Sequence, residues 1–324
     1  MQEPLITYQR NNEWLELSAT ALRDFSSAKG MEIQPLQANS HPHLVRQWLL
    51  ALAFFPDKWL NRLFSVGGIQ MDEDTVKLRT FIPVDPNKDP VYRLAKQPEI
   101  QSHAAAPVLY EDDWCLVLDK PSGMPVHTSA PGQRGTLDEA AARRCLLSGD
   151  LLPVKHIHRL DDETAGPVLY AKNELAQLKL DEAMRNKEID RVYAALAHGK
   201  LKKDHGTIQE PIGKDRHHNA RRRVTPGGDF AVTHYKIIEA YKDASLLQVR
   251  LETGRTHQIR VHMSYIGHPL VGDLLYGGSD PILKHQALRG EQLIFKHPLN
   301  RNMITVHSPE PPWFKQVRER YRSL

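Results

Sequence analysis

The chain has 324 residues, of which 40% are hydrophobic and 25% are charged. This composition is that of an ordinary globular protein, and no apolar run approaches the ~20 residues that a membrane span needs. The polar start at residues 1–4 also excludes a secretory signal, so we expect a cytoplasmic protein. The formal net charge of +4 is uneven: residues 1–100 carry 11 Lys and Arg against 12 Asp and Glu, and residues 101–324 carry 32 against 27.

The first 100 residues are predicted to form a small α/β appendage. Residues 44–55 and 58–64 have the apolar spacing of two helices, and residues 67–74 indicate a strand with an acidic turn. This order is similar to that of the S4-type RNA-binding module, but the segment lacks the many Lys and Arg side chains of that module. An S4-like module and an unrelated appendage are therefore both open alternatives.

Residues 102–107 are interpreted as a linker, and residues 101–324 as a second domain. The apolar patterns of this part predict strands at 114–118, 191–197, 232–240 and 245–252, and helices at 137–147 and 174–188. Strands outnumber helices and do not strictly alternate with them, so we expect an α+β fold with a mixed, largely antiparallel sheet. Cys115 and Cys145 share no CxxC motif and are expected to be buried thiols in a reducing compartment.

The run HIHRLDDETAG, residues 156–166, contains the strongest candidate for chemistry. Asp161 stands near Arg159, directly before a Thr-Ala-Gly turn and an apolar strand. A cation and nearby hydroxyl and amide donors can keep such a carboxylate ionised and aimed at a cleft. A zinc site that uses His156 and His158 is the alternative, but its spacing is wrong by one residue and its last histidine is missing. A kinase is excluded because no Gly-rich nucleotide loop precedes the run.

Two later segments add candidates. Tyr193 lies on the predicted strand 191–197, where a core position is the commoner role of a tyrosine. The block LETGRTHQIRVHM, residues 251–263, predicts a strand that ends at Gly254 and a helix that starts near Thr256. The start of this helix could hold a phosphate, with Arg255 alongside. Arg260, one turn into the helix, could reach Asp161, whereas a solvated helix face is the alternative.

The basic excess of the chain peaks in residues 200–223, which hold eight Lys and Arg against three Asp and Glu. Such a stretch suits a phosphate backbone, and a solvated loop without a partner is the alternative. The candidate phosphate contacts in this stretch are Lys214, Arg216, Arg221, Arg222 and Arg223.

Taken in order, these motifs resemble those of the RluA-type pseudouridine synthases. The family signature His-Arg-Leu-Asp-x-x-Thr-Ser-Gly matches residues 158–166, except that Ala165 stands where Ser is usual. Residues 110–127 are similar to the opening "Glu-Asp … Lys-Pro-x-Gly … Val-His", and residues 191–196 to the Lys-x-Tyr-x-Ala strand. The Gly-Arg-Thr-His-Gln-Ile-Arg-Val-His block of the family is matched residue for residue from Gly254. The resemblance covers about residues 106 to 298.

The resemblance implies an α+β catalytic domain with a central RNA-binding cleft, and an isomerase that converts uridine to pseudouridine without cofactor or metal. It assigns catalysis to Asp161, Tyr193 and Arg260: the aspartate acts on the nucleotide, the tyrosine stacks on the extruded base, and the arginine pairs with the aspartate. RNA contacts are expected from Arg159, from Arg255 and from the basic stretch, which resembles a clamp loop of the family.

The class of RNA is not settled by these motifs. Ribosomal RNA is the expected substrate of a monomeric enzyme, and transfer RNA is the alternative. A non-catalytic RNA-binding or ribosome-assembly protein is a further alternative, although such a protein does not need a carboxylate aimed at a polyanion.

Overall fold

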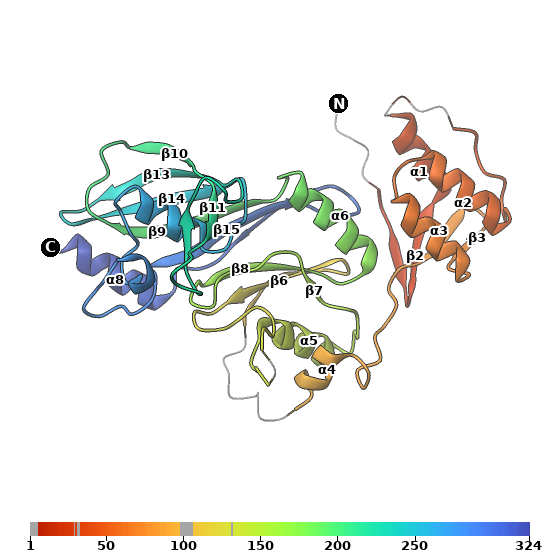
Figure 1. Ribbon diagram of the computed structural model, residues 1–324. Helices are drawn as coiled ribbons and strands as arrows, with labels where there is room; N and C mark the ends of the chain where they lie inside the picture. Colours follow the sequence, from red (N-terminus) through yellow and green to blue (C-terminus); the bar gives the residue numbers. More distant parts are fainter. Residues whose placement is uncertain (1–5, 29, 31–32, 98–105, 131) are drawn as a thin grey trace.

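A computed structural model describes residues 6–28, 30, 33–97, 106–130 and 132–324 (Figure 1). Most of the linker predicted at 102–107 lies outside the described residues. Within the described ranges, no helix is long and apolar enough to cross a membrane. The described elements form three larger sheets with their covering helices and one two-stranded sheet, and the N-terminal sheet lies at one end of the molecule.

The N-terminal region is a four-stranded antiparallel sheet with three helices. Its strands pair in the order β1-β2-β4-β3. The elements are β1 (Gln9–Asn11), β2 (Trp14–Ser18), α1 (Ala19–Ser27), α2 (Pro42–Ala51), α3 (Asp57–Ser65), β3 (Ile69–Asp72) and β4 (Thr75–Arg79). Both predicted helices and the strand with its acidic turn are therefore confirmed. The helix predicted at 44–55 ends early, because Ala53 has a φ of 49° and cannot continue it. An S4-like identity stays a prediction.

A second antiparallel sheet follows, with strand order β5-β6-β8-β7. Its elements and helices are α4 (Pro90–Ala95), β5 (Val108–Glu111), β6 (Cys115–Lys120), α5 (Leu137–Ser148), β7 (Lys155–His156), β8 (Gly166–Ala171) and α6 (Glu174–Arg185). Helix α5 starts at a capping box, in which Thr136 and Glu139 satisfy each other's backbone amides. Both cysteines are buried and free, as predicted.

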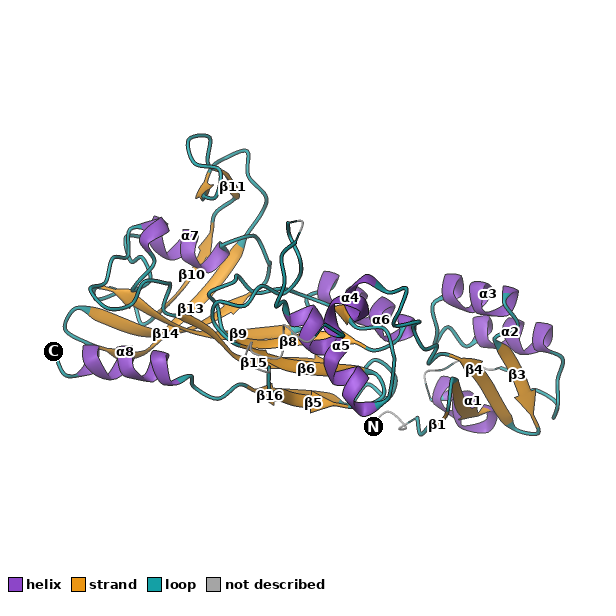
Figure 2. Ribbon diagram, turned by 90° about the horizontal axis from the view of Figure 1, so that it is seen from below, coloured by secondary structure: helices purple, strands orange, loops and turns teal. Residues whose placement is uncertain are grey.

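The third sheet is six-stranded, with the order β10-β13-β14-β9-β15-β16 and antiparallel pairing throughout. A two-stranded arm, β11–β12, stands out from it next to α7 in Figure 2. These elements are β9 (Asp190–His198), β10 (His205–Gln209), β11 (Ile212–Lys214), β12 (Arg222–Val224), β13 (Val232–Ala240), β14 (Ala244–Leu251), α7 (Gln258–Tyr265), the 3-10 helix η2 (Leu274–Tyr276), β15 (Leu288–Lys296), β16 (Met303–His307) and α8 (Pro312–Arg322). The α+β prediction is confirmed.

Alternation along β9 decides which side chains face the candidate site. Tyr193 and Ala195 belong to a core that includes α5 and α7, whereas Ala194 and Leu196 belong to the core under α8. Successive side chains of a strand point to opposite faces of its sheet. Tyr193 is therefore on the same face as α7.

The second and third sheets touch where β8 begins beside β15. The amide of Gly290 donates to the carbonyl of Ala165 at 2.7 Å. A Cβ on Gly166, whose φ is +135°, would lie 2.6 Å from the Cα of Gly290. Only glycine permits this approach. The crossing fixes the segment that follows Asp161 against the larger sheet.

Candidate active site

Asp161 lies in the loop between β7 and β8, and this loop is held from inside the protein. The Asp161 carbonyl accepts the amide of Thr164 at 2.9 Å. The fully buried Lys120 donates to the carbonyls of Asp162 at 2.6 Å, Met124 at 2.6 Å and Pro121 at 3.0 Å. Burial lowers the pKa of Lys120 to about 8. The lysine thus ties the Asp161 loop to the turn after β6.

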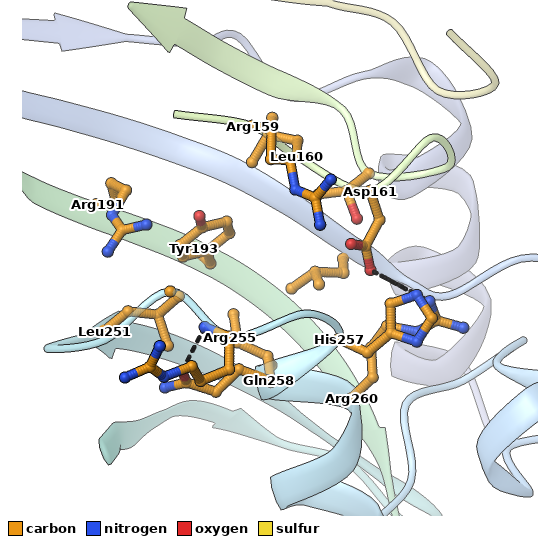
Figure 3. Close-up of a pocket in the computed structure, with 14 residues that line it drawn as sticks. Arg159, Leu160, Asp161, Arg191, Tyr193, Leu251, Arg255, His257, Gln258 and Arg260 are labelled. Atoms are coloured by element: carbon orange, nitrogen blue, oxygen red, sulfur yellow. Dashed lines mark hydrogen bonds and ion pairs between the residues drawn. The ribbon is translucent and has the colours of Figure 1, made fainter. Parts of the chain in front are cut away.

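The carboxylate of Asp161 pairs with Arg260 of α7, as predicted (Figure 3). Nη1 of Arg260 is 3.1 Å from Oδ2 of Asp161. The same guanidinium donates from Nε and Nη2 to the two oxygens of the buried Asp273, at 2.7 and 2.9 Å. Burial acts to lower the pKa of Arg260, but the hydrogen bond and charge of Asp273, helped by Asp161, raise it. This bidentate pair therefore aims the remaining Nη1 at Asp161.

His257 is the second group near the carboxylate. Its Nε2 is 3.9 Å from Oδ2 of Asp161, and its Nδ1 is 2.8 Å from the hydroxyl of Tyr276. Burial lowers the pKa of His257, although the charge of Asp161 opposes this effect. Both contacts from His257 and Arg260 fall on Oδ2, and among the described residues no hydrogen bond reaches Oδ1 of Asp161.

The helix predicted to start near Thr256 starts at Gln258 instead. The reason is His257, whose φ of 58° lies in the left-handed region and cannot belong to the helix. The amide of Arg255 already donates to Oε1 of Gln258 at 3.0 Å, so it is not free for the phosphate predicted there. The alternative of a solvated helix face is wrong for Arg260 and His262, which are both buried.

Tyr193 lines the same hollow as Asp161, between the Asp161 loop and the segment that starts α7 (Figure 3). Its ring is only 5% exposed. In the described part of the chain its hydroxyl has no hydrogen-bond partner. Burial raises the pKa of Tyr193; Arg191 opposes this effect, and Asp161 adds to it. The phenol is therefore neutral at physiological pH.

Two adjoining hollows meet at Asp161. The first lies toward Tyr193 and has apolar walls from Leu160, Leu251, Ile259 and Leu288. The second lies toward the turn after β6, and its lining includes His127, Ser129, Thr256 and Gln286. Both share Arg159, Leu160, Asp161, His257 and Arg260. A flat, half-polar group in the first hollow would lie next to the carboxylate.

The predicted RNA-binding residues fall into two groups. Arg159 and Arg255 are exposed and line the first hollow, and Arg159 donates to the Thr256 hydroxyl at 3.3 Å. The other five lie on the β11–β12 arm and line neither hollow: Lys214, Arg216, Arg221, Arg222 and Arg223. The structure thus places the arm cations beside the site and not in it.

The two histidines of the zinc alternative point to separate partners. His158 is buried, its Nε2 accepts the amide of Leu169 at 3.3 Å, and burial lowers its pKa to about 3. His156 lies 3.0 Å from Asp138 and stacks on His127. Across the described residues, no group of three or more His, Cys, Asp or Glu could hold a metal ion.

The sequence did not reveal the groups that orient the site. Asp273 belongs to none of the motifs described above, yet it holds Arg260 through two hydrogen bonds. Tyr276, three residues later, contacts both His257 and the Arg260 guanidinium, which lies 5.0 Å from its ring centre. Lys120 is the lysine of the Lys-Pro-x-Gly segment in residues 110–127, which by itself indicates only a turn. No local pattern marks these residues, because each acts on a partner that is distant in sequence or on another element.

Comparison with known proteins agrees with this architecture. Residues 114–265 match the family model described as RNA pseudouridylate synthase. The solved structure of human RNA pseudouridylate synthase domain containing 1 covers 68% of this chain and 95% of its own, with a TM-score of 0.54 at 23% identity. This likeness shows the fold of that class of enzyme.

Two curated relatives show to which family of enzymes the chain belongs. The RNA pseudouridine synthase YhcT of Bacillus subtilis is 42% identical over 226 residues, which are 69% of this chain and 75% of the relative. The ribosomal large subunit pseudouridine synthase D of Nitrosomonas europaea is 37% identical over 237 residues, 69% of each chain. The chain belongs to the RluA-type family of RNA pseudouridine synthases, which are isomerases.

Proposed function

We propose that this enzyme isomerises uridine to pseudouridine in ribosomal RNA and that Asp161 is its catalytic residue. One observation carries the assignment: Asp161 stands where the two hollows meet, with Oδ2 held by Arg260 and Oδ1 without a hydrogen-bond partner in the described chain. A carboxylate held on one oxygen presents the other to a ligand. The attraction of the paired arginine offsets part of the desolvation cost when the ligand excludes water.

The reaction is an exchange of bonds within one nucleotide. The bond from C1′ of the ribose to N1 of uracil breaks, the freed base turns, and C1′ bonds to C5. The proton of C5 is lost and N1 gains one, so the atoms balance and nothing is oxidised or reduced. Oδ1 of Asp161 would act as the nucleophile, or stabilise the developing charge, at C1′ or C6.

The uridine must leave its stack to reach Asp161, which costs a few kcal/mol and less in a loop or bulge. Tyr193 would stack on the extruded base, a contact that contributes about 1–3 kcal/mol. Because the buried phenol stays neutral, it is a poor base by itself. We therefore assign Tyr193 to stacking first, and to removal of the C5 proton only together with a second group.

The cations around the site suit the RNA backbone. Arg159 and Arg255 line the first hollow and would contact the strand beside the extruded nucleotide, and Arg159 would fill the gap that the base leaves. The five cations of the β11–β12 arm would bind phosphates further along the strand, without reading sequence.

The substrate proposal is supported by the relatives. Several relatives 36–37% identical carry the name ribosomal large subunit pseudouridine synthase D, including those of Nitrosomonas europaea and Vibrio vulnificus. By this analogy we infer a ribosomal RNA substrate. We further propose that the enzyme is a monomer and works in the cytoplasm.

A tritium-release assay tests the proposal. Ribosomal and transfer RNA, labelled with tritium at C5 of uridine, are prepared from cells that lack this protein and are incubated with the purified enzyme. We expect release from ribosomal RNA by the wild type and none by Asp161→Asn, which should still bind the RNA. Release from transfer RNA alone would contradict the proposed ribosomal RNA substrate. Full release by Asp161→Asn would contradict the assignment of catalysis to Asp161.

A further inference from the structure

Tyr276 joins the β11–β12 arm to the neighbourhood of Asp161. This residue ends η2 and is 4% exposed. Its hydroxyl accepts the main-chain amide of Arg222, on β12, at 2.9 Å. The same hydroxyl is 2.8 Å from Nδ1 of His257, whose other nitrogen faces Asp161. One oxygen thus stands between the arm and the catalytic carboxylate.

These contacts decide where the proton of His257 lies. The Tyr276 oxygen already accepts from Arg222, and its own O–H needs an acceptor because it is buried. Within the described chain, Nδ1 of His257 is the acceptor at hydrogen-bond distance. If Nδ1 accepts, the proton of the neutral imidazole must be on Nε2. Nε2–H then points to Oδ2 of Asp161, 3.9 Å away.

The imidazole of His257 is mostly neutral, so its single proton is either on Nδ1 or on Nε2. The charged groups that act on the imidazole are Asp161 and Asp273 on one side and Arg260 and Arg222 on the other. Burial, helped by the two cations, outweighs the two carboxylates, so the pKa of His257 lies below its ordinary value. The neutral form therefore dominates at pH 7, and the position of its one proton is what the surroundings control.

We propose that Tyr276 is a positioning residue that couples the seating of the β11–β12 arm to the tautomer of His257 beside Asp161. The inference rests on the proposed function of Asp161. With the arm seated, Arg222 occupies one lone pair of the Tyr276 oxygen, and the O–H is directed to His257. Nε2–H then faces Oδ2 at 3.9 Å, which is beyond hydrogen-bond distance but close enough for electrostatic attraction, while Arg260 donates the hydrogen bond to Oδ2 and Oδ1 is left for the nucleotide. When the arm amide withdraws, the Tyr276 oxygen can instead accept a hydrogen bond from Nδ1–H, and Nε2 then carries no proton toward Asp161.

The RNA-free enzyme labelled with ¹⁵N-histidine allows a direct test by NMR, with the His257 signals assigned from their loss in His257→Gln. At a pH where His257 is neutral, the wild type should show the proton on Nε2 alone. A proton on Nδ1 would overturn the proposal, and this part of the test needs no other variant. Tyr276→Phe keeps the ring against Arg260 and removes the hydroxyl, so it should show a mixture of both tautomers.

Hydrogen exchange tests the arm side of the coupling. The amide of Arg222 should exchange about tenfold faster in Tyr276→Phe than in the wild type, because its acceptor is gone. Tyr241→Phe is the matched control: it loses a hydroxyl that donates to Glu239 at 2.6 Å, remote from Asp161. This control should change neither the tautomer nor the Arg222 amide. Arg222→Ala retains the main-chain donor and should also leave the tautomer unchanged; a changed tautomer there would assign the effect to the side chain.

Single-turnover conversion of ribosomal RNA separates this inference from the proposed function. Tyr276→Phe should slow conversion about tenfold and change RNA affinity less than twofold, while Tyr241→Phe keeps the wild-type rate. Full activity of Asp161→Asn would overturn the proposed function itself. An inactive Asp161→Asn together with a Tyr276→Phe enzyme of wild-type rate and tautomer would overturn the role of Tyr276 alone.

Discussion

The carboxylate of Asp161 depends on side chains that never touch it. Asp273 accepts two hydrogen bonds from Arg260, and Nη1 of the guanidinium remains to donate to Asp161. Lys120 fixes the backbone of the next residue, Asp162. A buried charge needs such partners, because desolvation otherwise cancels what its attraction contributes. Positioning at this site is therefore distributed over three segments that are distant in the sequence.

Lys120 should make the stability of the fold depend on alkaline pH. Its pKa is about 8 in the folded protein and 10.5 ordinarily, so between these values the unfolded chain binds more protons. Its contribution to the free energy of unfolding thus rises with pH across this window, by about 3 kcal/mol at most. Lys120→Met should lack this rise, and urea unfolding at pH 7, 9 and 10.5 measures the difference between the two proteins. A constant difference would contradict the prediction.

At the scale of the element, the β11–β12 arm carries five Lys and Arg side chains that line neither hollow. Replacing Arg221, Arg222 and Arg223 by Gln should weaken RNA binding and lower the slope of log K against log salt by about 0.7 for each phosphate that the arm no longer binds. Filter binding at several salt concentrations measures the slope. The exposed Lys88 and Lys315, changed to Gln together, serve as the control outside the arm. An unchanged slope in the arm variant would show that the arm does not touch phosphates.

The crossing of β8 and β15 is a second element on which the site depends. Gly166→Ala would place a methyl group 2.6–2.8 Å from the backbone of Gly290 at a φ that alanine rarely adopts. We expect a loss of about 1–3 kcal/mol in the free energy of unfolding, together with reduced activity as the Asp161 loop shifts. The control is Gly227→Ala, where a Cβ meets nothing within 4 Å. Equal stability of the two variants by thermal unfolding would refute this account of the crossing.

The elements and contacts that the sequence predicted are those with a local signal. Alternating or helical apolar spacing located α5, α6, β9, β13 and β14 to within a few residues. The pairing of Asp161 with Arg260 was expected from the place of Arg260 one turn into the predicted helix and from the family resemblance. The positive φ of His257 could not be predicted from the sequence. A glycine often indicates a positive φ, whereas a histidine does not. Tyr276 and Asp273 gained their roles only when the chain after α7 folded back onto that helix.

At the scale of the molecule, one hydrophobic core joins the N-terminal sheet to the second and third sheets. It runs from Leu15 and Leu17 through Trp114 to Phe295. The described part of the N-terminal region therefore packs against the rest of the chain. The division of the chain near residue 100 stays a prediction. A continuous core of this kind favours unfolding in a single cooperative transition.

Arg10 should strengthen this junction. Its guanidinium contacts Asp113 at 3.0 Å and Asp150 at 2.8 and 2.5 Å, and it lies 4.6 Å from the centre of the Phe81 ring. Arg10→Ala should lower the free energy of unfolding by about 1.5–3 kcal/mol, because these charged hydrogen bonds are partly buried. Arg23→Ala, which breaks an exposed pair, is the control and should cost less than about 1 kcal/mol. Denaturant unfolding that ranks the two variants equally would argue against this role of Arg10.

The most direct test of the central claim is a map of pseudouridine in total RNA by carbodiimide-induced stops of reverse transcription. The map compares cells with the wild-type protein, cells without it, and cells with only Asp161→Asn. We expect at least one stop in ribosomal RNA that is present in the first and absent from the other two. A stop that persists in the Asp161→Asn cells but vanishes without the protein would contradict the assignment of catalysis to Asp161.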